Sequence, residues 1–265
     1  MKRRADWTKW LETVPSKGRV TFELEEAVQR ASGERRTAIN ALRRAAIEGR
    51  VAHIQRGFFA WVAPEYRSAK GPPFHWVIHA WMGFLQSRYY VGLLSAASLH
   101  GSAHNAPMEN QVVTSKQIRT TTYGDSRVRF IARRNNWPPD VLLEKKSGYQ
   151  DSFFVSGPEL TLVDLVKNPA YAGGWDNIAT IAKDLGGKIR LKKLSMALES
   201  EETPILQRLG WLFDQLGFTK AAQELLGALG SRFVKRTLLD PRVKVGGDFE
   251  PRFQLTINHK IEPEE

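Results

Sequence analysis

The sequence predicts an α+β fold, with an N-terminal winged helix-turn-helix domain followed by a larger mixed α/β C-terminal domain with a helix-rich end. In the first 67 of the 265 residues, apolar patterns follow the order helix, short strand, two helices and hairpin. A break comes next, because Gly71, Pro72 and Pro73 interrupt regular structure. After the break, strand-like segments give way to successive helical patterns. The expected parts are the winged helix-turn-helix domain at 1–67, a linker at 68–74 and an effector domain at 75–265.

The elements of the first domain follow from local patterns. Asp6 is expected to cap a first helix, with its apolar residues at helical spacing and Pro15 as its stop. A short extended piece at 17–22 and a second helix at 23–31 follow. Ser32 is expected to cap a third helix that runs to about Glu48. Its left-handed C-cap falls on Gly49.

A hairpin completes this domain. Two short apolar runs, 51–55 and 58–62, alternate as strands do and are joined at Arg56 and Gly57. A winged helix-turn-helix domain has this order of helices and hairpin. The aromatic run of the hairpin has two interpretations, stacking against single-stranded bases or packing within the domain.

Positive charge is concentrated in the first domain. The whole chain has a formal net charge of +11. Residues 1–67 hold 14 Lys and Arg against 8 Asp and Glu, whereas the other 198 residues hold 25 against 20. The first quarter therefore carries more than half of the excess. A small basic domain joined to a nearly balanced one is typical of a nucleic-acid binder with a separate effector domain.

The third helix divides into two faces on a helical wheel. Ile39, Leu42 and Ala46 cluster on one side and are expected to pack into the domain. The alanines at 38, 41 and 45 are expected to keep the helix slim enough to enter a DNA groove. The residues expected to face outward, or to flank that face, are Arg36, Thr37, Asn40, Arg43 and Arg44.

The outward residues have the chemistry that reads DNA in the major groove. Arginine can bond to guanine O6 and N7, asparagine to adenine N6 and N7, and threonine can contact a thymine methyl group. Lys17, Arg19 and Arg56 are expected to bind phosphates, which makes the affinity fall as salt rises. The sequence thus predicts binding to double-stranded DNA.

The C-terminal domain is expected to be mixed. Two helices are predicted within 74–101, then strands at 110–115, 117–122, 127–134 and 151–156. Helical patterns dominate afterwards, and they are predicted at 160–166, 175–185, 193–198, 204–216 and 220–229, before one last strand in "RFQLTIN".

Composition excludes several classes of protein. The chain has no cysteine, which rules out disulfides, thiolate metal sites and cysteine nucleophiles and fits a reducing cytoplasm. No apolar run long enough for a signal peptide follows the basic start. The most apolar segment, 74–101, is interrupted by polar residues, so no membrane span is expected. We expect a cytoplasmic protein that needs no cofactor.

Catalytic patterns are weak. His75 and His79, and likewise His100 and His104, stand four residues apart, but a zinc site needs a further ligand and a base. The segment 138–146 resembles part of a metal-dependent nuclease core. Its Asp140 and Glu144 are too close in sequence to lie on two separate strands. A nuclease or nucleic-acid-modifying enzyme targeted by the winged helix, and a ligand-sensing regulator, stay open as alternatives.

Four segments resemble AbiEi-type antitoxins of bacterial type IV toxin–antitoxin, or abortive-infection, systems. They are "YYVGLLSAASLHG" (89–101), "QVVTSKQIR" (111–119), "SGPELTLVDLV" (156–166) and "RLGWLFDQLG" (208–217). The resemblance implies a winged helix-turn-helix that binds inverted repeats in its own promoter and represses the operon. It also implies a C-terminal domain that neutralises a nucleotidyltransferase toxin, without requiring a stable complex. It offers no catalytic residues, and it is compatible with a monomer that binds DNA cooperatively.

Overall fold

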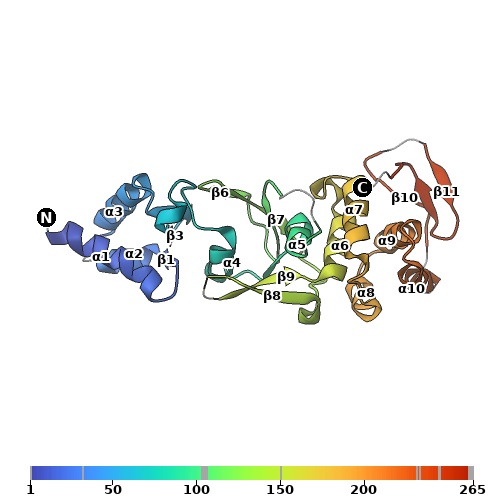
Figure 1. Ribbon diagram of the computed structural model, residues 1–265, viewed down its shortest axis with the longest axis horizontal. Helices are drawn as coiled ribbons and strands as arrows, with labels where there is room; N and C mark the ends of the chain where they lie inside the picture. Colours follow the sequence, from blue (N-terminus) through green and yellow to red (C-terminus); the bar gives the residue numbers. More distant parts are fainter. Residues whose placement is uncertain are drawn as a thin grey trace. The chain divides into compact units, whose positions relative to one another are not determined.

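The structure is a computed structural model that describes residues 2–31, 33–102, 107–149, 151–230, 232, 234–243 and 246–261. The chain forms two compact units. The first comprises Met1–Tyr90, Met108–Arg134 and Lys145–Phe154, and the second comprises Val91–Pro107, Asn135–Glu144 and Val155–Glu265. Figure 1 colours the chain from the N-terminus to the C-terminus and labels most of its elements. The predicted α+β class is confirmed at this level: helices with a small sheet, then a larger mixed sheet, then helices.

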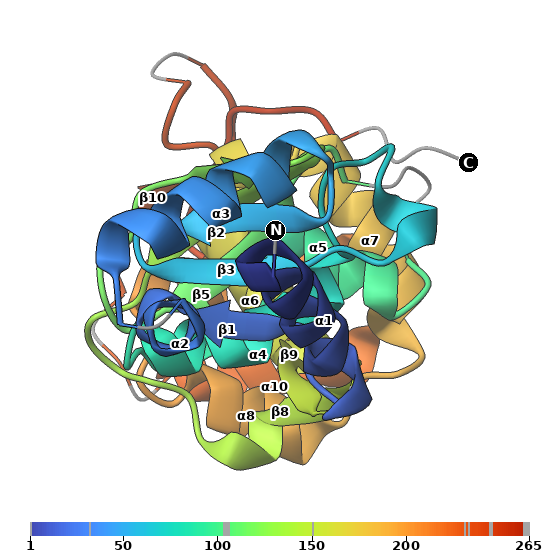
Figure 2. The ribbon, with the colours of Figure 1, turned by 90° about the vertical axis from the view of Figure 1, so that its left-hand side faces the viewer.

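The first unit begins with three helices and a three-stranded sheet. In chain order the elements are α1 Lys2–Ser16, β1 Thr21–Glu23, α2 Leu24–Arg30, α3 Arg35–Ile47, β2 Val51–Gln55 and β3 Phe58–Trp61. The strands pair antiparallel in the order β1-β3-β2. Figure 2 shows the three helices on the near side of these strands. The element order predicted for this part of the chain is present.

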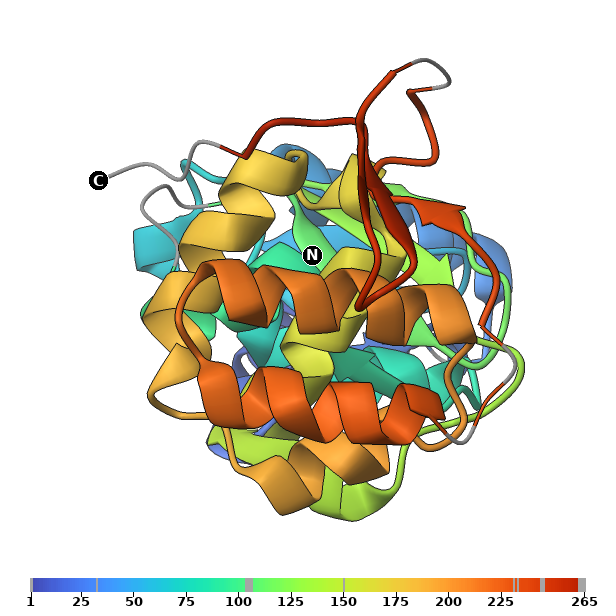
Figure 3. The ribbon, with the colours of Figure 1, turned by 90° about the vertical axis from the view of Figure 1, so that its right-hand side faces the viewer.

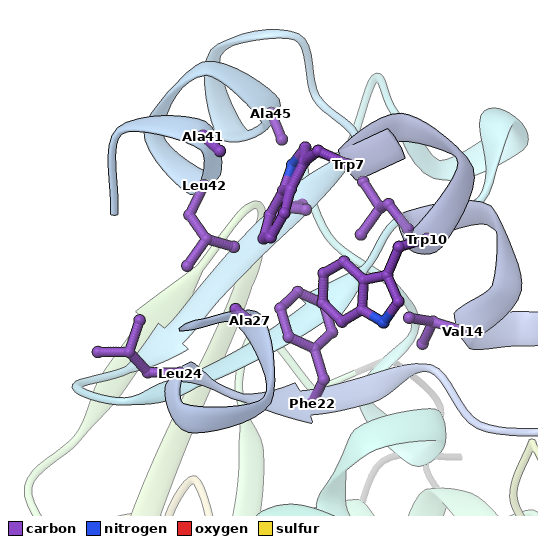
Figure 4. Packing of buried hydrophobic residues seen from close by; sticks show 11 residues of the cluster. Trp7, Trp10, Val14, Phe22, Leu24, Ala27, Ala41, Leu42 and Ala45 are labelled. Carbon is purple, nitrogen blue, oxygen red and sulfur yellow. The ribbon is translucent and has the colours of Figure 1, made fainter. Parts of the chain in front are cut away.

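Large aromatic side chains from α1 and β1 fill the space under α2 and α3 (Figure 4). The indole rings of Trp7 and Trp10 lie 4.7 Å apart, and Trp10 meets the ring of Phe22 edge-on at 5.2 Å. All three side chains are buried. Because each buries a large apolar area, this cluster is a major source of the stability of the segment.

Two details of the first helices differ from the sequence prediction. Helix α1 begins at Lys2, so Asp6 lies inside the helix and not at the predicted N-cap position. Pro15 lies in the last turn, and the helix ends one residue later. The predicted cap Ser32 lies outside the described residues. Gly33, at φ +79°, lies in the turn between α2 and α3, and Gly49 after α3 has the left-handed φ of +68° that was predicted.

Six strands form the larger sheet. The elements of this part are η1 Pro64–Tyr66, α4 Phe74–Phe84, β4 Tyr89–Val91, β5 Asn110–Thr114, β6 Thr121–Tyr123, β7 Ser126–Ala132, η2 Asp140–Leu142, β8 Leu143–Ser147 and β9 Ser152–Ser156. The strand order is β6-β7-β5-β4-β9-β8. The pairs β4–β9 and β5–β7 are parallel, whereas β6–β7 is antiparallel. The strands predicted at 110–115, 127–134 and 151–156 are therefore confirmed, and β6 covers part of the one predicted at 117–122.

The segment predicted as a linker is packed within the first unit. The amide of Asp125 donates to the carbonyl of Ala69 at 3.0 Å, and a Cβ added to Gly71 would lie 2.9 Å from the ring of Tyr123. Nearby, the Nε1 of Trp81 on α4 donates to Oε1 of Gln55 on β2 at 2.8 Å. Residues 68–74 therefore run in contact with the larger sheet.

Helices dominate the second unit. Its elements are α5 Leu93–Leu99, α6 Pro158–Lys167, η3 Pro169–Tyr171, α7 Trp175–Gly186, α8 Leu191–Leu198, α9 Thr203–Gln215, α10 Thr219–Gly230, β10 Thr237–Leu238, β11 Asp248–Glu250 and β12 Leu255–Ile257. Figure 3 shows α9 and α10 side by side. Helix α6 is buried from Pro158 to Val166, and α5, α7, α8 and α9 pack around it. The helix-rich end is thus confirmed. Across the described residues, none of the helices combines the length and the apolar character that a membrane crossing requires.

Candidate nucleic-acid interface

Helix α3 carries an exposed polar face. Arg36, Asn40, Arg43 and Arg44 are all exposed, as predicted from the wheel. Thr37 is half-buried, and its Oγ1 donates to Oε2 of Glu34 at 2.6 Å. Residues three and four apart are neighbours on a helix, so Arg36, Asn40 and Arg43 form one continuous row.

The buried face of α3 differs from the prediction. The side chains in the core belong to Ala38, Ala41, Leu42 and Ala45. Ile39 is half-buried and Ala46 is exposed, so only Leu42 of the three predicted core residues is buried as expected. The reason is the size of the partners, because the small alanines let the helix approach the indole rings of α1 closely (Figure 4). The alanines therefore face the core and not a DNA groove.

The arginines on this face differ in their ion pairing. Arg35 pairs with Glu25 on α2 at 3.0 Å. Within the described part of the chain, Arg36, Arg43 and Arg44 have no carboxylate within ion-pair distance. Their three positive charges are therefore uncompensated and stand on one short helix, where they produce a positive potential that attracts an anionic partner.

A groove lies between α3 and the β2–β3 hairpin. We call it the α3–hairpin groove; it has a volume of about 820 Å³. Arg43 lines it from the helix, and the exposed Arg56 lines it from the hairpin tip, next to Gly57 at φ +83°. Its other lining residues are Leu24, Glu25, Arg35, Ile39, Leu42, Ala46, His53, Gly57, Phe59 and Phe84. The groove is thus lined by apolar side chains together with cationic side chains from both the helix and the hairpin, and by Glu25, which pairs with Arg35.

Two of the predicted phosphate-binding residues lie elsewhere. Lys17 follows α1 and is exposed, and Arg19 is half-buried and pairs with Glu26 on α2. Neither lines the α3–hairpin groove. The structure therefore brings Arg43 and Arg56 together but does not bring Lys17 or Arg19 to the same groove.

Two lining residues were missed at the sequence level. Arg35 and His53 both line the α3–hairpin groove and are exposed. The signal for His53 is the alternation in β2, where residues on either side of it are buried. The signal for Arg35 is its spacing to Arg43. At about 100° per residue, this spacing places Arg35 on the side of α3 that is nearer the hairpin.

The aromatic residues of the hairpin are used in packing. The ring of Phe58 is buried and stacks on Phe84 of α4, with ring centroids 4.9 Å apart. Phe59 stacks on the buried Phe22 at 5.8 Å. Trp61 is half-buried and packs against the core of the first helices. Of the two interpretations, packing within the domain therefore accounts for these side chains.

The residues of the weak catalytic patterns have structural roles or stand apart. His79 shares a hydrogen bond with the hydroxyl of Tyr89 at 3.1 Å, and His100 Nε2 lies 2.7 Å from the carbonyl oxygen of Ser156. His104 lies outside the described residues. Asp140 lies in η2 and Glu144 in β8. Among the residues that the structure describes, no three or more His, Asp or Glu side chains are grouped so that they could hold a metal ion.

Fold and surface together define an α+β protein with an exposed cationic helix near its N-terminus. Residues 90–215 match the family model described as AbiEi antitoxin C-terminal domain, which confirms the resemblance to AbiEi antitoxins for this segment. An antitoxin family implies a toxin as partner.

Comparison with solved structures gives the same fold for nearly the whole chain. The chain resembles the crystal structure of the RV2827C protein from Mycobacterium tuberculosis with a TM-score of 0.68 and 18% sequence identity. The likeness covers 94% of this chain and 90% of that chain. No curated protein matches the sequence. At this identity the likeness establishes a shared fold.

Proposed function

We propose that the chain is a DNA-binding antitoxin that represses its own operon and neutralises a nucleotidyltransferase toxin. In this proposal residues 1–67 are a winged helix-turn-helix domain that binds inverted repeats in the promoter. Residues 75–265 act on the toxin, with 68–74 as the connection between the two. Neither role requires a cofactor or a catalytic residue.

The observation that carries the DNA-binding part is the face of α3. Arg36, Arg43 and Arg44 are exposed and have no ion-pair partner among the described residues, and the amide of Asn40 lies in the same row. Holding like charges together costs free energy unless an anion accompanies them. A phosphate backbone with guanine bases next to it is an anionic surface that suits these side chains.

The surrounding elements support the same proposal. Helices α2 and α3 are joined by a short turn at Gly33, and the β2–β3 hairpin follows directly. An α-helix is about 10–12 Å wide with its side chains, and the major groove of DNA is about 12 Å wide. With α3 in the major groove, the hairpin tip at Arg56 comes to the adjacent backbone.

Each predicted contact residue then has a role. Arg36, Arg43 and Arg44 bond to guanine edges, Asn40 bonds to adenine, and Thr37 contacts a base or a phosphate. Arg56, with Lys17 and Arg19, binds phosphates. Because Arg19 is already paired with Glu26, its contribution to phosphate binding is expected to be the smallest of the three.

The antitoxin part rests on the family match over residues 90–215. A toxin of the nucleotidyltransferase class is the partner that this family suggests, and neutralisation need not involve a stable complex. Each chain has one helix α3, so an inverted repeat requires two chains. We therefore propose a monomer in solution and cooperative binding of two molecules on DNA.

The full-length chain with Asn40→Ala and Arg44→Ala tests both parts at once. Promoter binding is measured by fluorescence anisotropy, and neutralisation by growth of cells that also express the toxin from the neighbouring gene. The expected result is loss of promoter binding with full rescue of growth. Rescue that disappears together with DNA binding would refute the separation of the two roles.

A further inference from the structure

Ile47, the last residue of α3, is 87% exposed. Neither packing nor helix propensity accounts for this side chain. It makes no contribution to the core beneath the helix, and a β-branched residue is a weaker helix former than the alanine or arginine found at most other positions of α3. The exposed side chain of Ile47 is therefore free to contact a partner molecule.

The position of Ile47 on the helix indicates the class of that partner. Arg36, Asn40, Arg43 and Ile47 are spaced by four, three and four residues. At about 100° per residue they fall within roughly 60° of arc, so they form one straight row along the outward face. We call this row the α3 ridge. Its first three members are among the residues proposed to read bases, and Ile47 is its apolar end.

The charge next to Ile47 is compensated. Glu48, the residue that follows it, pairs with Arg50 at 2.7 Å and accepts a second bond from the Nε of that guanidinium at 2.9 Å. An uncompensated carboxylate here would repel a phosphate backbone. The ion pair weakens that repulsion, so the C-terminal end of α3 can approach DNA as its N-terminal end does.

We propose that Ile47 contacts the 5-methyl group of a thymine in the major groove and so adds a thymine to the sequence that α3 reads. This inference rests on the proposed function. The methyl group is the apolar feature that distinguishes a thymine edge in that groove, and apolar side chains recognise it. An isoleucine at the end of a row of base readers has the required chemistry.

The length of the α3 ridge predicts how far apart the bases that Arg36 and Ile47 contact lie along the DNA. From Arg36 to Ile47 there are 11 residues, which at 1.5 Å per residue correspond to about 16 Å along the helix axis. Base pairs are stacked about 3.4 Å apart. With α3 lying along the groove, the thymine lies about four to five base pairs from the base that Arg36 contacts.

The test uses the full-length chain and the duplex that it selects most strongly from a random-sequence pool. Each thymine of that duplex is replaced in turn by deoxyuridine, which lacks only the methyl group, and affinities are measured for the wild type and Ile47→Ala. Ile47 is exposed and alanine is a good helix former, so the variant is expected to fold normally. Met108→Ala, which removes a fully exposed methionine that is not part of α3, is the matched control.

At one thymine, wild-type affinity is expected to fall about three- to tenfold on loss of the methyl group, the range for one or two methyl-sized groups that lose burial. Ile47→Ala is expected to bind the thymine duplex about three- to tenfold more weakly than the wild type does. Its affinity is expected not to change when deoxyuridine replaces that thymine. Met108→Ala is expected to behave as the wild type.

Three results overturn the inference. In the first, Ile47→Ala binds as tightly as the wild type while Asn40→Ala is weakened, which leaves the proposed function standing. In the second, Ile47→Ala loses affinity equally on thymine and deoxyuridine duplexes. This pattern, with reduced cooperativity, assigns Ile47 to a contact between two protein molecules. In the third, the chain selects no duplex, and the proposed function fails with it.

Discussion

Arg43 on α3 and Arg56 at the tip of the β2–β3 hairpin line opposite sides of the same groove. The two residues are 13 positions apart in sequence, and the turn at Gly49 and strand β2 bring them together. In the proposed complex Arg43 reads a base and Arg56 binds a phosphate. This division between specificity and affinity can be tested one residue at a time.

Arg56→Ala is expected to weaken binding to every duplex alike. One phosphate contact contributes about 0.9 to the slope of log affinity against log salt, so the slope should become shallower by roughly that amount. Anisotropy titrations at several salt concentrations measure it. Lys183→Ala, which removes an exposed charge on α7 in the second unit, is the control and should leave the slope unchanged. If the salt slope of Arg56→Ala equals that of the wild type, Arg56 does not contact the phosphate backbone of the DNA.

Arg43→Lys is expected to lose specificity while it keeps its charge. Lysine lacks the planar fork that bonds to both acceptors of guanine, so discrimination against the wrong base should fall by about 1–3 kcal/mol at one position. The salt slope should stay as in the wild type. The check is a comparison of affinities for duplexes that differ at single base pairs. Equal discrimination in the variant and the wild type would mean that Arg43 does not read a base.

The orientation of α3 around its own axis predicts which alanines can be enlarged without loss of stability. Ala45 is 1% exposed and packs in the core, whereas the neighbouring Ala46 is exposed. Ala45→Leu should overpack the cluster around the tryptophans and lower the free energy of unfolding by about 1–3 kcal/mol. Ala46→Leu should change it by less than about 0.5 kcal/mol. Urea unfolding of both variants measures the two free energies. If Ala46→Leu were the more destabilising variant, Ala46 would face the core, as the helical wheel predicted.

The hydrogen bonds of Asp240, in the C-terminal segment, predict how the stability of the fold depends on pH. Asp240 is buried and accepts three hydrogen bonds from Arg242, at 2.9, 3.0 and 2.7 Å, and these hold the pKa of Asp240 below its usual value. A carboxyl group whose pKa is lowered in the folded state stabilises the fold at neutral pH. That contribution is lost as the pH falls from about 4, the unfolded pKa, through the folded value.

Asp240→Asn should therefore cost about 1 kcal/mol at pH 7, the usual contribution of such hydrogen bonds. The difference from the wild type should shrink as the pH falls below about 4. Unfolding curves measured across this range test it, with the exposed Asp125→Asn as the control. A difference that stays constant with pH would show that the ionised form of Asp240 contributes nothing.

Much of the fold could be predicted because it depends on local patterns. The helices at 160–166, 175–185 and 220–229 are confirmed to within a few residues, since their apolar spacing and turn residues are local signals. Strand β4 was missed because Tyr89–Val91 is short and wholly buried, and it reads as part of a helical apolar run. Strand β8 was missed because "LEKKS" is mostly polar and becomes a strand only through its position at the sheet edge.

The outward residues of α3 could also be predicted, since arginine and asparagine at those positions have no place in a core. Of the residues that α3 buries, only Leu42 was predicted correctly. Ala41 and Ala45 are buried in the cluster that holds the large rings of Trp7 and Trp10, and a wheel for one helix holds no information about its partners. For the same reason the groove between Arg43 and Arg56, and the exposure of Ile47, required the structure.

The central claim is that the outward face of α3 binds double-stranded DNA. The most direct measurement is an anisotropy titration of the full-length chain with the duplex upstream of its own coding sequence, in parallel with a scrambled duplex. The wild type should bind the upstream duplex far more tightly than the scrambled one, and the variant Asn40→Ala with Arg44→Ala should bind both duplexes at the weak, scrambled level. A variant that binds the upstream duplex as tightly as the wild type would contradict the claim.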